Sequence, residues 1–264
     1  MDDWAAQAGS GIRLEWGPAG AGRLAAAVAC LVVVDVLSFT TAVSIAVRQG
    51  TRILPFWLPD GPASAPERAA AEKAAAVYAQ QSGARLAVDR RAVTPATPWS
   101  LSPAHLRTAP FVARLVLPSP NDAAITAAAP PHVRVVAVCL RNITAAGEWL
   151  TARGYGTPQH PVAVIAAGER WPDGSLRPAL EDLLAAGALI CDLHTQGAGP
   201  LSAEAAAAKA LYEGTADLPH AVATSASGRE LAVTGFAEDV AIATEEDACV
   251  IVPVRDRDGA FAPG

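Results

Sequence analysis

Residues 24–47 read LAAAVACLVVVDVLSFTTAVSIAV and carry a single charge, at Asp35. A membrane-spanning helix needs about 20 apolar residues, and an Asp at its centre costs roughly 2.5–3.5 kcal/mol on insertion. The stretch also changes character at Asp35, because residues 31–34 are rich in β-branched side chains and residues 38–47 begin like a helix. It therefore predicts a buried strand, an acidic turn and a helix, with the carboxylate at the exposed end of the strand.

Strand-like and helix-like segments alternate along the rest of the chain. Strand-like runs occur at residues 12–16, 31–37, 52–57, 85–88, 113–117, 133–138, 162–166 and 249–254. Helical patterns occur at residues 40–49, 66–81, 121–128, 143–153, 178–190, 203–213 and 238–244. This alternation predicts an α/β fold with three layers, α/β/α, around a largely parallel or mixed sheet. We expect residues 1–264 to form one domain, as one body or as two lobes, with residues 255–264 as a flexible tail.

The charge balance excludes one class of partner. The chain has a formal net charge of −6 and lacks the clustered Lys and Arg that sequence-independent nucleic-acid binding needs. Its first residues, Met1-Asp2-Asp3-Trp4, do not form a basic region followed by an apolar segment, so we expect a cytoplasmic protein with no membrane partner. Charged residues make up only 17% of the chain, and this sparse charge favours a homodimer.

The turn after Asp35 has the composition of an anion site. Ser38, Thr40 and Thr41 can cap the following helix and direct its free N–H groups at an anion. A carboxylate beside an anion repels it unless a divalent cation lies between them, and magnesium is usually held by one or two carboxylates with phosphate oxygens and water. The alternative is that Asp35 only caps the helix.

Glu181 and Asp182 stand at the start of a predicted helix, where the helix dipole already favours acidic side chains. The preceding strand, residues 162–166, runs into a glycine-containing loop of the kind that forms sites between strands and helices. If this strand lies near the one that carries Asp35, several carboxylates converge on one ion.

Asn121 and Asn142 each follow a strand and precede a helix, where Asn commonly serves as an N-cap. These two side chains, together with Arg141 and Arg229, could also donate hydrogen bonds to a charged ligand at the edge of the sheet. A surface position without a ligand is the commoner case for an Arg. The sequence leaves both roles open for all four residues.

Taken in order, these segments resemble the 2-phosphosulfolactate phosphatase family, the ComB-like enzymes of coenzyme M biosynthesis. The resemblance is carried by residues 15–18, residues 32–37 with Thr40 and Thr41, Asn121, Asn142, residues 165–168, residues 180–183 with Ala186 and Gly187, residues 227–229, Asp239, and residues 252–253. It implies a magnesium-dependent phosphatase that hydrolyses 2-phosphosulfolactate to sulfolactate and phosphate. It also implies that Asp35, Glu181 and Asp182 form the catalytic and metal-binding centre. Whether Asp35 attacks phosphorus or orients metal and water stays open.

The chain departs from the family pattern in residues 139–142, where the family has Ser-Phe-Leu-Asn and this chain has Cys-Leu-Arg-Asn, and at two further positions near the expected substrate. The family usually has an Arg after Asp-Val-Leu, where this chain has Ser38, and we expect Arg141 to replace the missing cation. The family also has a Gly where this chain has Asp122. These differences favour two alternatives: a phosphatase of the same fold for another small phosphoester, with residues 94–110 setting its selectivity, or an anion-binding homologue without activity.

Overall fold

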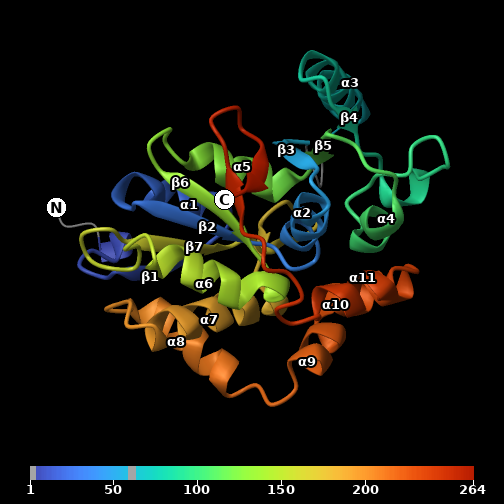
Figure 1. The fold of residues 1–264 in the computed structure, drawn as a ribbon. Coiled ribbons are helices and arrows are strands. Elements are labelled where there is room, and N and C mark those ends of the chain that lie inside the picture. Colours follow the sequence, from blue (N-terminus) through green and yellow to red (C-terminus); the bar gives the residue numbers. More distant parts are fainter. Residues whose placement is uncertain (1–3, 59–63) are drawn as a thin grey trace.

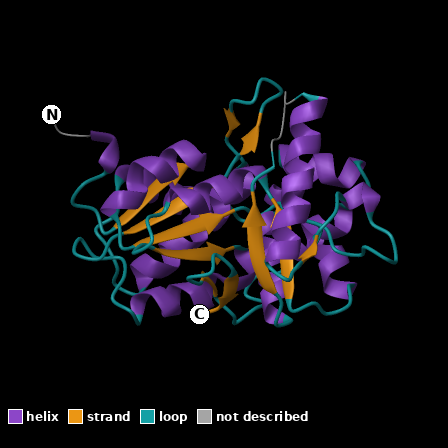
Figure 2. Cartoon of the chain, turned by 90° about the horizontal axis from the view of Figure 1, so that it is seen from above, coloured by secondary structure: helices purple, strands orange, loops and turns teal. Residues whose placement is uncertain are grey.

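The chain folds around one twisted sheet with helices on both faces (Figures 1 and 2). The computed structural model describes residues 4–58 and 64–264, so the expectation drawn from residues 1–3 lies outside the described residues. The order of the nine strands in the sheet is β1-β7-β2-β6-β10-β11-β3-β5-β4. These strands are β1 (Ile12–Trp16), β2 (Cys30–Val34), β3 (Arg52–Phe56), β4 (Arg85–Leu86), β5 (Arg114–Pro118), β6 (Arg134–Val138), β7 (Val162–Ala166), β10 (Pro253–Arg255) and β11 (Phe261–Pro263). A separate hairpin pairs β8 (Glu169–Arg170) with β9 (Leu176–Arg177).

Two parallel groups of strands make up the sheet, and the antiparallel pair β10-β11 joins them. The first group is β1-β7-β2-β6 and the second is β3-β5-β4. In Figure 2 the strands of one group run nearly across the view and those of the other nearly upright, so the sheet twists strongly between them. The sheet is mixed and largely parallel, which confirms the predicted fold class.

The helices form the two outer layers. Those of the described residues are α1 (Gly17–Leu24), α2 (Phe39–Arg48), α3 (Ala65–Gln81), α4 (Pro103–Thr108), α5 (Pro120–Ala128), α6 (Ile143–Thr151), α7 (Leu180–Thr195), α8 (Ala203–Glu213), α9 (Leu218–Thr224), α10 (Ala226–Val233) and α11 (Ala237–Ala243). Short 3-10 turns are η1 (Trp4–Ala6), η2 (Ala25–Ala27), η3 (Arg90–Ala92) and η4 (Leu140–Asn142). Figure 1 shows α1, α2 and α5 over one face of the sheet and α6, α7 and α8 over the other. None of the described helices combines the length and apolar character needed to cross a bilayer.

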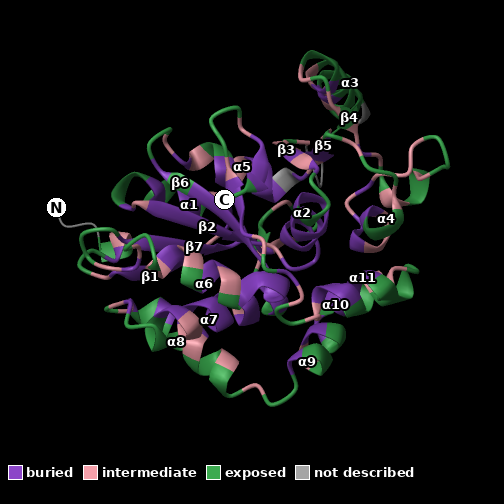
Figure 3. Cartoon of the chain, in the orientation of Figure 1, coloured by how far each residue is buried: buried purple, intermediate pink, exposed green. Residues whose placement is uncertain are grey.

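Strand β2 shows why this arrangement suits the sequence. Its side chains alternate between the two apolar clusters of the core: Val32 and Val34 pack with α6 and α7, while Leu31 and Val33 pack with α1, α2 and α5. All five residues of the strand are fully buried (Figure 3). The predicted succession of strand, acidic turn and helix is confirmed, since β2 ends at Val34 and α2 begins at Phe39.

The prediction of a flexible tail at residues 255–264 is wrong. These residues contain β11, which lies inside the sheet between β10 and β3. Phe261 is fully buried and packs edge-on against Phe39 of α2, with ring centroids 6.2 Å apart. Short strands beside polar turn residues gave no periodic signal, and burial against α2 holds them in place.

Residues 94–110, which we expected to set substrate selectivity, contain helix α4. Ser102 caps α4 by accepting a hydrogen bond from the His105 N–H at 3.3 Å. Leu106 of this helix is buried in the apolar cluster that includes α2. The segment therefore forms a packed wall beside α2 and α11.

Candidate active site

Asp35 lies directly after the carboxyl end of β2, in the middle of the first group of strands. Its Oδ1 atom accepts a hydrogen bond from the N–H of Phe39, the first residue of α2, at 3.0 Å. The carboxylate is thus oriented by the free N-terminal end of that helix, which favours negative charge.

Asp182, in the first turn of α7, connects two strand ends. Its Oδ1 accepts from the Val36 N–H at 2.8 Å, and its Oδ2 accepts from the Gly168 N–H at 2.9 Å. The side chain therefore fixes the turns that follow β2 and β7 relative to each other. Its neighbour Glu181 is 1% exposed, and the Glu181 Oε2 atom has no hydrogen-bond partner among the described residues.

A further carboxyl group comes from α5. Asp122 is fully buried, accepts a hydrogen bond from Ser119 Oγ at 2.5 Å, and shares a hydrogen bond with the carboxyl group of Asp35. Asn121, beside it, donates from Nδ2 to the Gly168 carbonyl oxygen at 3.0 Å. The N-terminus of α5 thereby meets the ends of β2 and β7, although β5 is five places from β2 in the sheet order.

The carboxyl groups of Asp35, Asp122, Glu169, Glu181 and Asp182 form one electrostatically connected set, here called the acid cluster. Burial raises the pKa of Asp35, and burial followed by the charge of Asp35 raises the pKa of Asp122 and Asp182 well above the usual range. The same two causes raise the pKa of Glu169 to about 8. The cluster therefore holds more acidic groups than the protein around it can stabilise in ionised form.

Arg90 is the cation that approaches the turn after Asp35. Its Nη2 donates to Ser38 Oγ at 2.8 Å and its Nη1 pairs with Asp239 at 3.2 Å. Asp239 is fully buried and also accepts from Ser102 Oγ at 2.6 Å. The charge of Arg90 lowers the pKa of Asp35, although burial remains the larger influence. Arg90 also lines a cavity of about 620 Å³ that reaches Pro118 at the end of β5, so a small molecule has room beside it.

The β8–β9 hairpin supplies a second cation, Arg177, near the acid cluster. Arg177 lowers the pKa of Glu169 through its charge, while burial acts more strongly in the opposite direction. Its Nη2 donates to Ser227 Oγ at 3.3 Å, and its guanidinium lies over the Trp171 ring at 5.8 Å from the centroid. Two arginines from different parts of the chain, Arg90 and Arg177, thus both interact electrostatically with Glu169 of the acid cluster.

The family model for 2-phosphosulpholactate phosphatase matches residues 21–258, nearly the whole chain. The chain belongs to the 2-phosphosulpholactate phosphatase family. It is accordingly a phosphoric monoester hydrolase by family. No curated protein matches the chain.

Several residues predicted for the site of this phosphatase do come together in the structure. Asp35 and Asp182 are linked through the Val36 N–H, and the charge of Glu181 raises the pKa of both carboxyl groups. Asn121 reaches the same loop through Gly168. Ser38 lies next to them but accepts its hydrogen bond from Arg90, a residue that the sequence interpretation did not single out.

Thr40 and Thr41 have a different role from the predicted one. The Thr40 hydroxyl donates to the Asp35 carbonyl oxygen at 2.6 Å and accepts from the Asp35 N–H at 3.1 Å. The Thr41 hydroxyl donates to the Val36 carbonyl oxygen at 2.8 Å. Both hydroxyl protons are therefore bound by the backbone, and the two side chains brace the acidic turn rather than face an anion.

Arg141, Asn142 and Arg229 are not brought to the acid cluster by their contacts. Arg141 pairs with Glu245 and donates to the Ile242 carbonyl oxygen, so it does not replace the cation missing at position 38. Asn142 accepts from the Cys139 N–H at 2.9 Å and donates to the Ala137 carbonyl oxygen at 3.3 Å, which matches a local structural role. Arg229 is exposed on α10, and its neighbour Ser227 makes the contact toward the site.

The sequence interpretation missed Arg90 and the role of Asp122. Asp89-Arg90-Arg91 follows the predicted strand at residues 85–88, and charged residues at a strand end are a usable signal in an α/β sheet. Asp122 was interpreted as a departure from the family pattern, because sequence order does not reveal that α5 reaches β2. The structure places its carboxyl group against Asp35.

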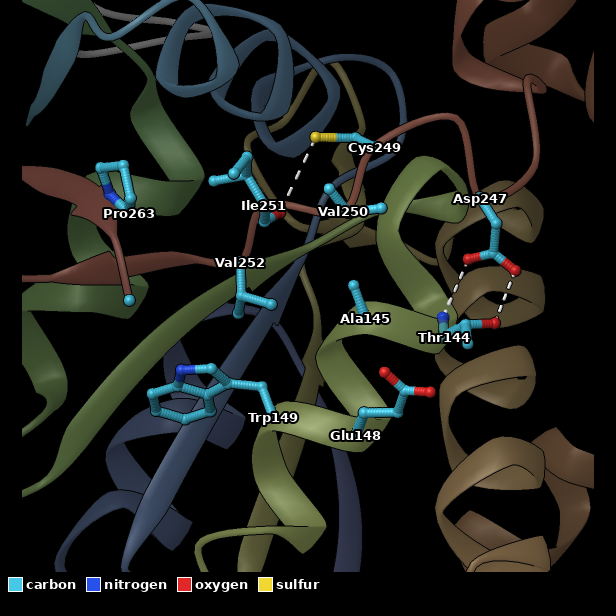
Figure 4. Close-up of a pocket in the computed structure, with 11 residues that line it drawn as sticks. Thr144, Ala145, Glu148, Trp149, Asp247, Cys249, Val250, Ile251, Val252 and Pro263 are labelled. Carbon is cyan, nitrogen blue, oxygen red and sulfur yellow. Dashed lines mark hydrogen bonds between the residues drawn. The ribbon is translucent and has the colours of Figure 1, made fainter.

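A cavity of about 640 Å³ between α6 and the chain before β10 is a poor candidate for this chemistry (Figure 4). Its walls are largely apolar, from residues such as Ala145, Val250 and Val252. One of its two acids, Asp247, already accepts from the Thr144 N–H at 2.9 Å and from the Thr144 hydroxyl at 2.7 Å. No convergence of acids and arginines like that at the end of β2 lines this cavity.

Proposed function

We propose that this chain is a magnesium-dependent phosphatase that hydrolyses 2-phosphosulfolactate to sulfolactate and inorganic phosphate, as in coenzyme M biosynthesis, and that it acts in the cytoplasm. The family supplies the reaction class. The observation that carries the proposal is the convergence of the acid cluster at the end of β2, with Arg90 interacting with Asp35 and Glu169 and Arg177 interacting with Glu169. Phosphoryl transfer depends mainly on positioning and charge stabilisation, which such groups supply.

The residues present fit a divalent cation bound by two carboxylates. Within residues 4–58 and 64–264, no three His, Cys, Asp or Glu side chains are arranged to hold a metal together. Magnesium needs only one or two carboxylates when water and a phosphate complete its shell. Glu181 offers a buried oxygen that lacks a hydrogen-bond partner among those residues, and burial raises the pKa of Asp35 nearby. We assign Asp35 and Glu181 as ligands; the bound ion would polarise a phosphoryl oxygen.

The remaining residues position the site and bind the anion. Asp182 uses both carboxylate oxygens on the backbone of Val36 and Gly168, so it serves the site by holding these two turns. Arg90 and Arg177 are the groups we assign to the anionic ends of the substrate, since guanidinium groups bind phosphate and sulfonate oxygens with charge-assisted hydrogen bonds. Their separate elements allow contact with two different anionic groups.

The test is phosphate release from 2-phosphosulfolactate and from a panel of small phosphoesters, with magnesium and with EDTA. We expect turnover that requires magnesium and that falls at least 100-fold in Asp35→Asn and Glu181→Gln. Glu204→Gln, which changes an exposed acid on α8, is the matched control and should keep full activity. Equal activity of wild type and Asp35→Asn on every ester would rule out the proposed centre.

A second candidate is a phosphatase of the same fold for another small phosphoester. This candidate is favoured by Arg90, which supplies the cation near Ser38. Arg90 belongs to a different element from the turn, so its guanidinium approaches from a different direction than an Arg at position 38 would. The ester panel separates the two: a higher kcat/KM for another ester would select this candidate. Stabilisation of the fold by phosphate without turnover of any ester would instead select an anion-binding homologue.

A further inference from the structure

Three arginines surround a cavity of about 460 Å³ at the C-terminal end of α2. The cavity is lined by Ile45, Arg48, Gln49, Arg107, Arg141 and Glu245. Asp35 contacts the opposite end of this helix, at Phe39, and ten helical residues span about 15 Å. The cavity is therefore separate from the acid cluster.

The carboxylate among the residues that line this cavity, Glu245, pairs with two of the three guanidinium groups. Arg107 donates to Glu245 through both terminal nitrogens, Nη1 at 2.9 Å and Nη2 at 2.7 Å, and Arg141 contacts the same carboxylate through Nη1. Arg48 donates to the Ala248 carbonyl oxygen at 3.0 Å. The hydrogen bonds from Arg107 are the main cause that lowers the pKa of Glu245 to about 2. With Glu245 ionised, the residues that line the cavity carry a net charge of two positive units.

Arg141 forms the buried side of this cavity. Its side chain is only 2% exposed, and its Nε atom has no hydrogen-bond partner among the described residues. Burying a guanidinium with an unused donor is costly unless an acceptor is supplied. Arg48 and Arg107, by contrast, are exposed and can move to meet a ligand.

We propose that this cavity is a second anion site, which binds a small doubly charged oxyanion such as phosphate, sulfate or the phosphate group of a monoester. The two negative charges of the ligand match the net charge of two positive units on the cavity lining. The guanidinium groups come from three elements, so they can contact a tetrahedral oxyanion from several sides. Glu245 competes with the ligand for Arg107 and Arg141. The site does not depend on the proposed hydrolysis, because none of its residues belongs to the acid cluster.

The test is calorimetric titration of the metal-free protein with inorganic phosphate, with sulfate and with glycerol 2-phosphate, in EDTA. We expect Arg48→Gln and Arg107→Gln to bind each anion at least tenfold more weakly than wild type. Glu245→Gln should bind them more tightly, because it removes the competing carboxylate. Tighter binding of the ester than of phosphate assigns a monoester ligand, and the reverse order assigns the free oxyanion.

Arg52→Gln is the matched control, since Arg52 also pairs with carboxylates, Asp256 and Asp258, but lies outside this cavity. It should bind the anions as wild type does. If Arg107→Gln has a lower melting temperature than wild type without anion, Arg48→Gln still tests the proposal, because Arg48 is exposed and its one hydrogen bond among the described residues goes to the Ala248 carbonyl oxygen. Equal affinities in Arg48→Gln, Glu245→Gln and Arg52→Gln would overturn the proposal.

Discussion

Glu169→Gln should weaken a pH dependence of stability that the acid cluster imposes on the metal-free protein. In the folded chain the pKa of Glu169 rises to about 8, from its ordinary value of 4.5, because of burial first and the charge of Asp35 second. Below pH 4.5 the group is protonated in the folded and the unfolded chain, and its contribution to stability is complete. Between pH 4.5 and about 8 the unfolded chain has released this proton while the folded chain still holds it, so stability falls as the pH rises through this range. Above pH 8 the folded chain carries the buried charge and the loss is complete.

The magnitude follows from the size of the shift. Each pKa unit corresponds to about 1.36 kcal/mol, so the whole shift sets an upper limit of about 5 kcal/mol on the loss. Glu169 is partly exposed and Arg177 faces it, so water and this cation reduce the effect. We expect Glu169→Gln to be about 2 kcal/mol more stable than wild type at pH 9 and equal to it near pH 4. The pKa shifts of Asp35, Asp122 and Asp182 act in the same direction in both proteins.

The assay is urea unfolding in EDTA at pH 4, 6, 7.5 and 9, followed by far-UV circular dichroism. Plotted against pH, the difference in unfolding free energy between variant and wild type should grow between pH 5 and 9. Adding magnesium at pH 9 should shrink it, because a bound cation stabilises the ionised cluster. Glu204→Gln, an exposed acid, should show no such trend. A variant whose stability runs parallel to wild type at every pH would refute the reasoning.

Four further outcomes test the fold and the site. Phe261→Ala should lose about 3–5 kcal/mol of unfolding free energy in urea titrations, because the ring is fully buried against α2. Gly187→Ala should lose about 1–3 kcal/mol in the same assay, since a Cβ atom there meets the backbone of Ala208 on α8. Arg90→Gln should raise KM for the phosphoester roughly tenfold or more, as expected for one lost charge-assisted hydrogen bond, while Arg52→Gln, which changes an arginine paired with Asp256 and Asp258, leaves it unchanged. The homodimer stays a prediction, and light scattering should give twice the chain mass of 27.0 kDa.

The elements that sequence predicts best are those with a strong periodic or compositional signal. The start of strand β2 was predicted within one residue and its end three residues too late, while helix α2 was predicted within one residue at each end. A run of β-branched side chains interrupted by Asp35 has few other solutions. Phe261–Pro263 gave no such signal, since a three-residue strand has no measurable alternation. Its place in the sheet depends on partners β10 and β3, which lie far away in sequence.

The site residues also divide into those that local sequence predicts and those that depend on the tertiary fold. Asp35, Glu181 and Asp182 each follow a strand or begin a helix, so local sequence marks them. Their neighbour Asp122 could not be placed, because it depends on the twist that brings α5 from the second group of strands to β2. Arg141 has equally suitable local sequence, yet Glu245 binds it at the other end of α2. Position next to a strand end selects candidates, and the tertiary fold decides among them.

The departures from the family pattern at Ser38 and Asp122 make physical sense together. An Arg at position 38 would be a cation within the turn itself, whereas Ser38 is 2% exposed and accepts from Arg90 instead. Asp239 anchors Arg90 on its far side, so the guanidinium is held between a carboxylate and the turn. At the same time Asp122 adds a buried acid against Asp35. Burial and the charge of Asp35 raise the pKa of Asp122 well above its usual range, and a divalent cation such as the one we propose for this site would favour the ionised form of both carboxyl groups.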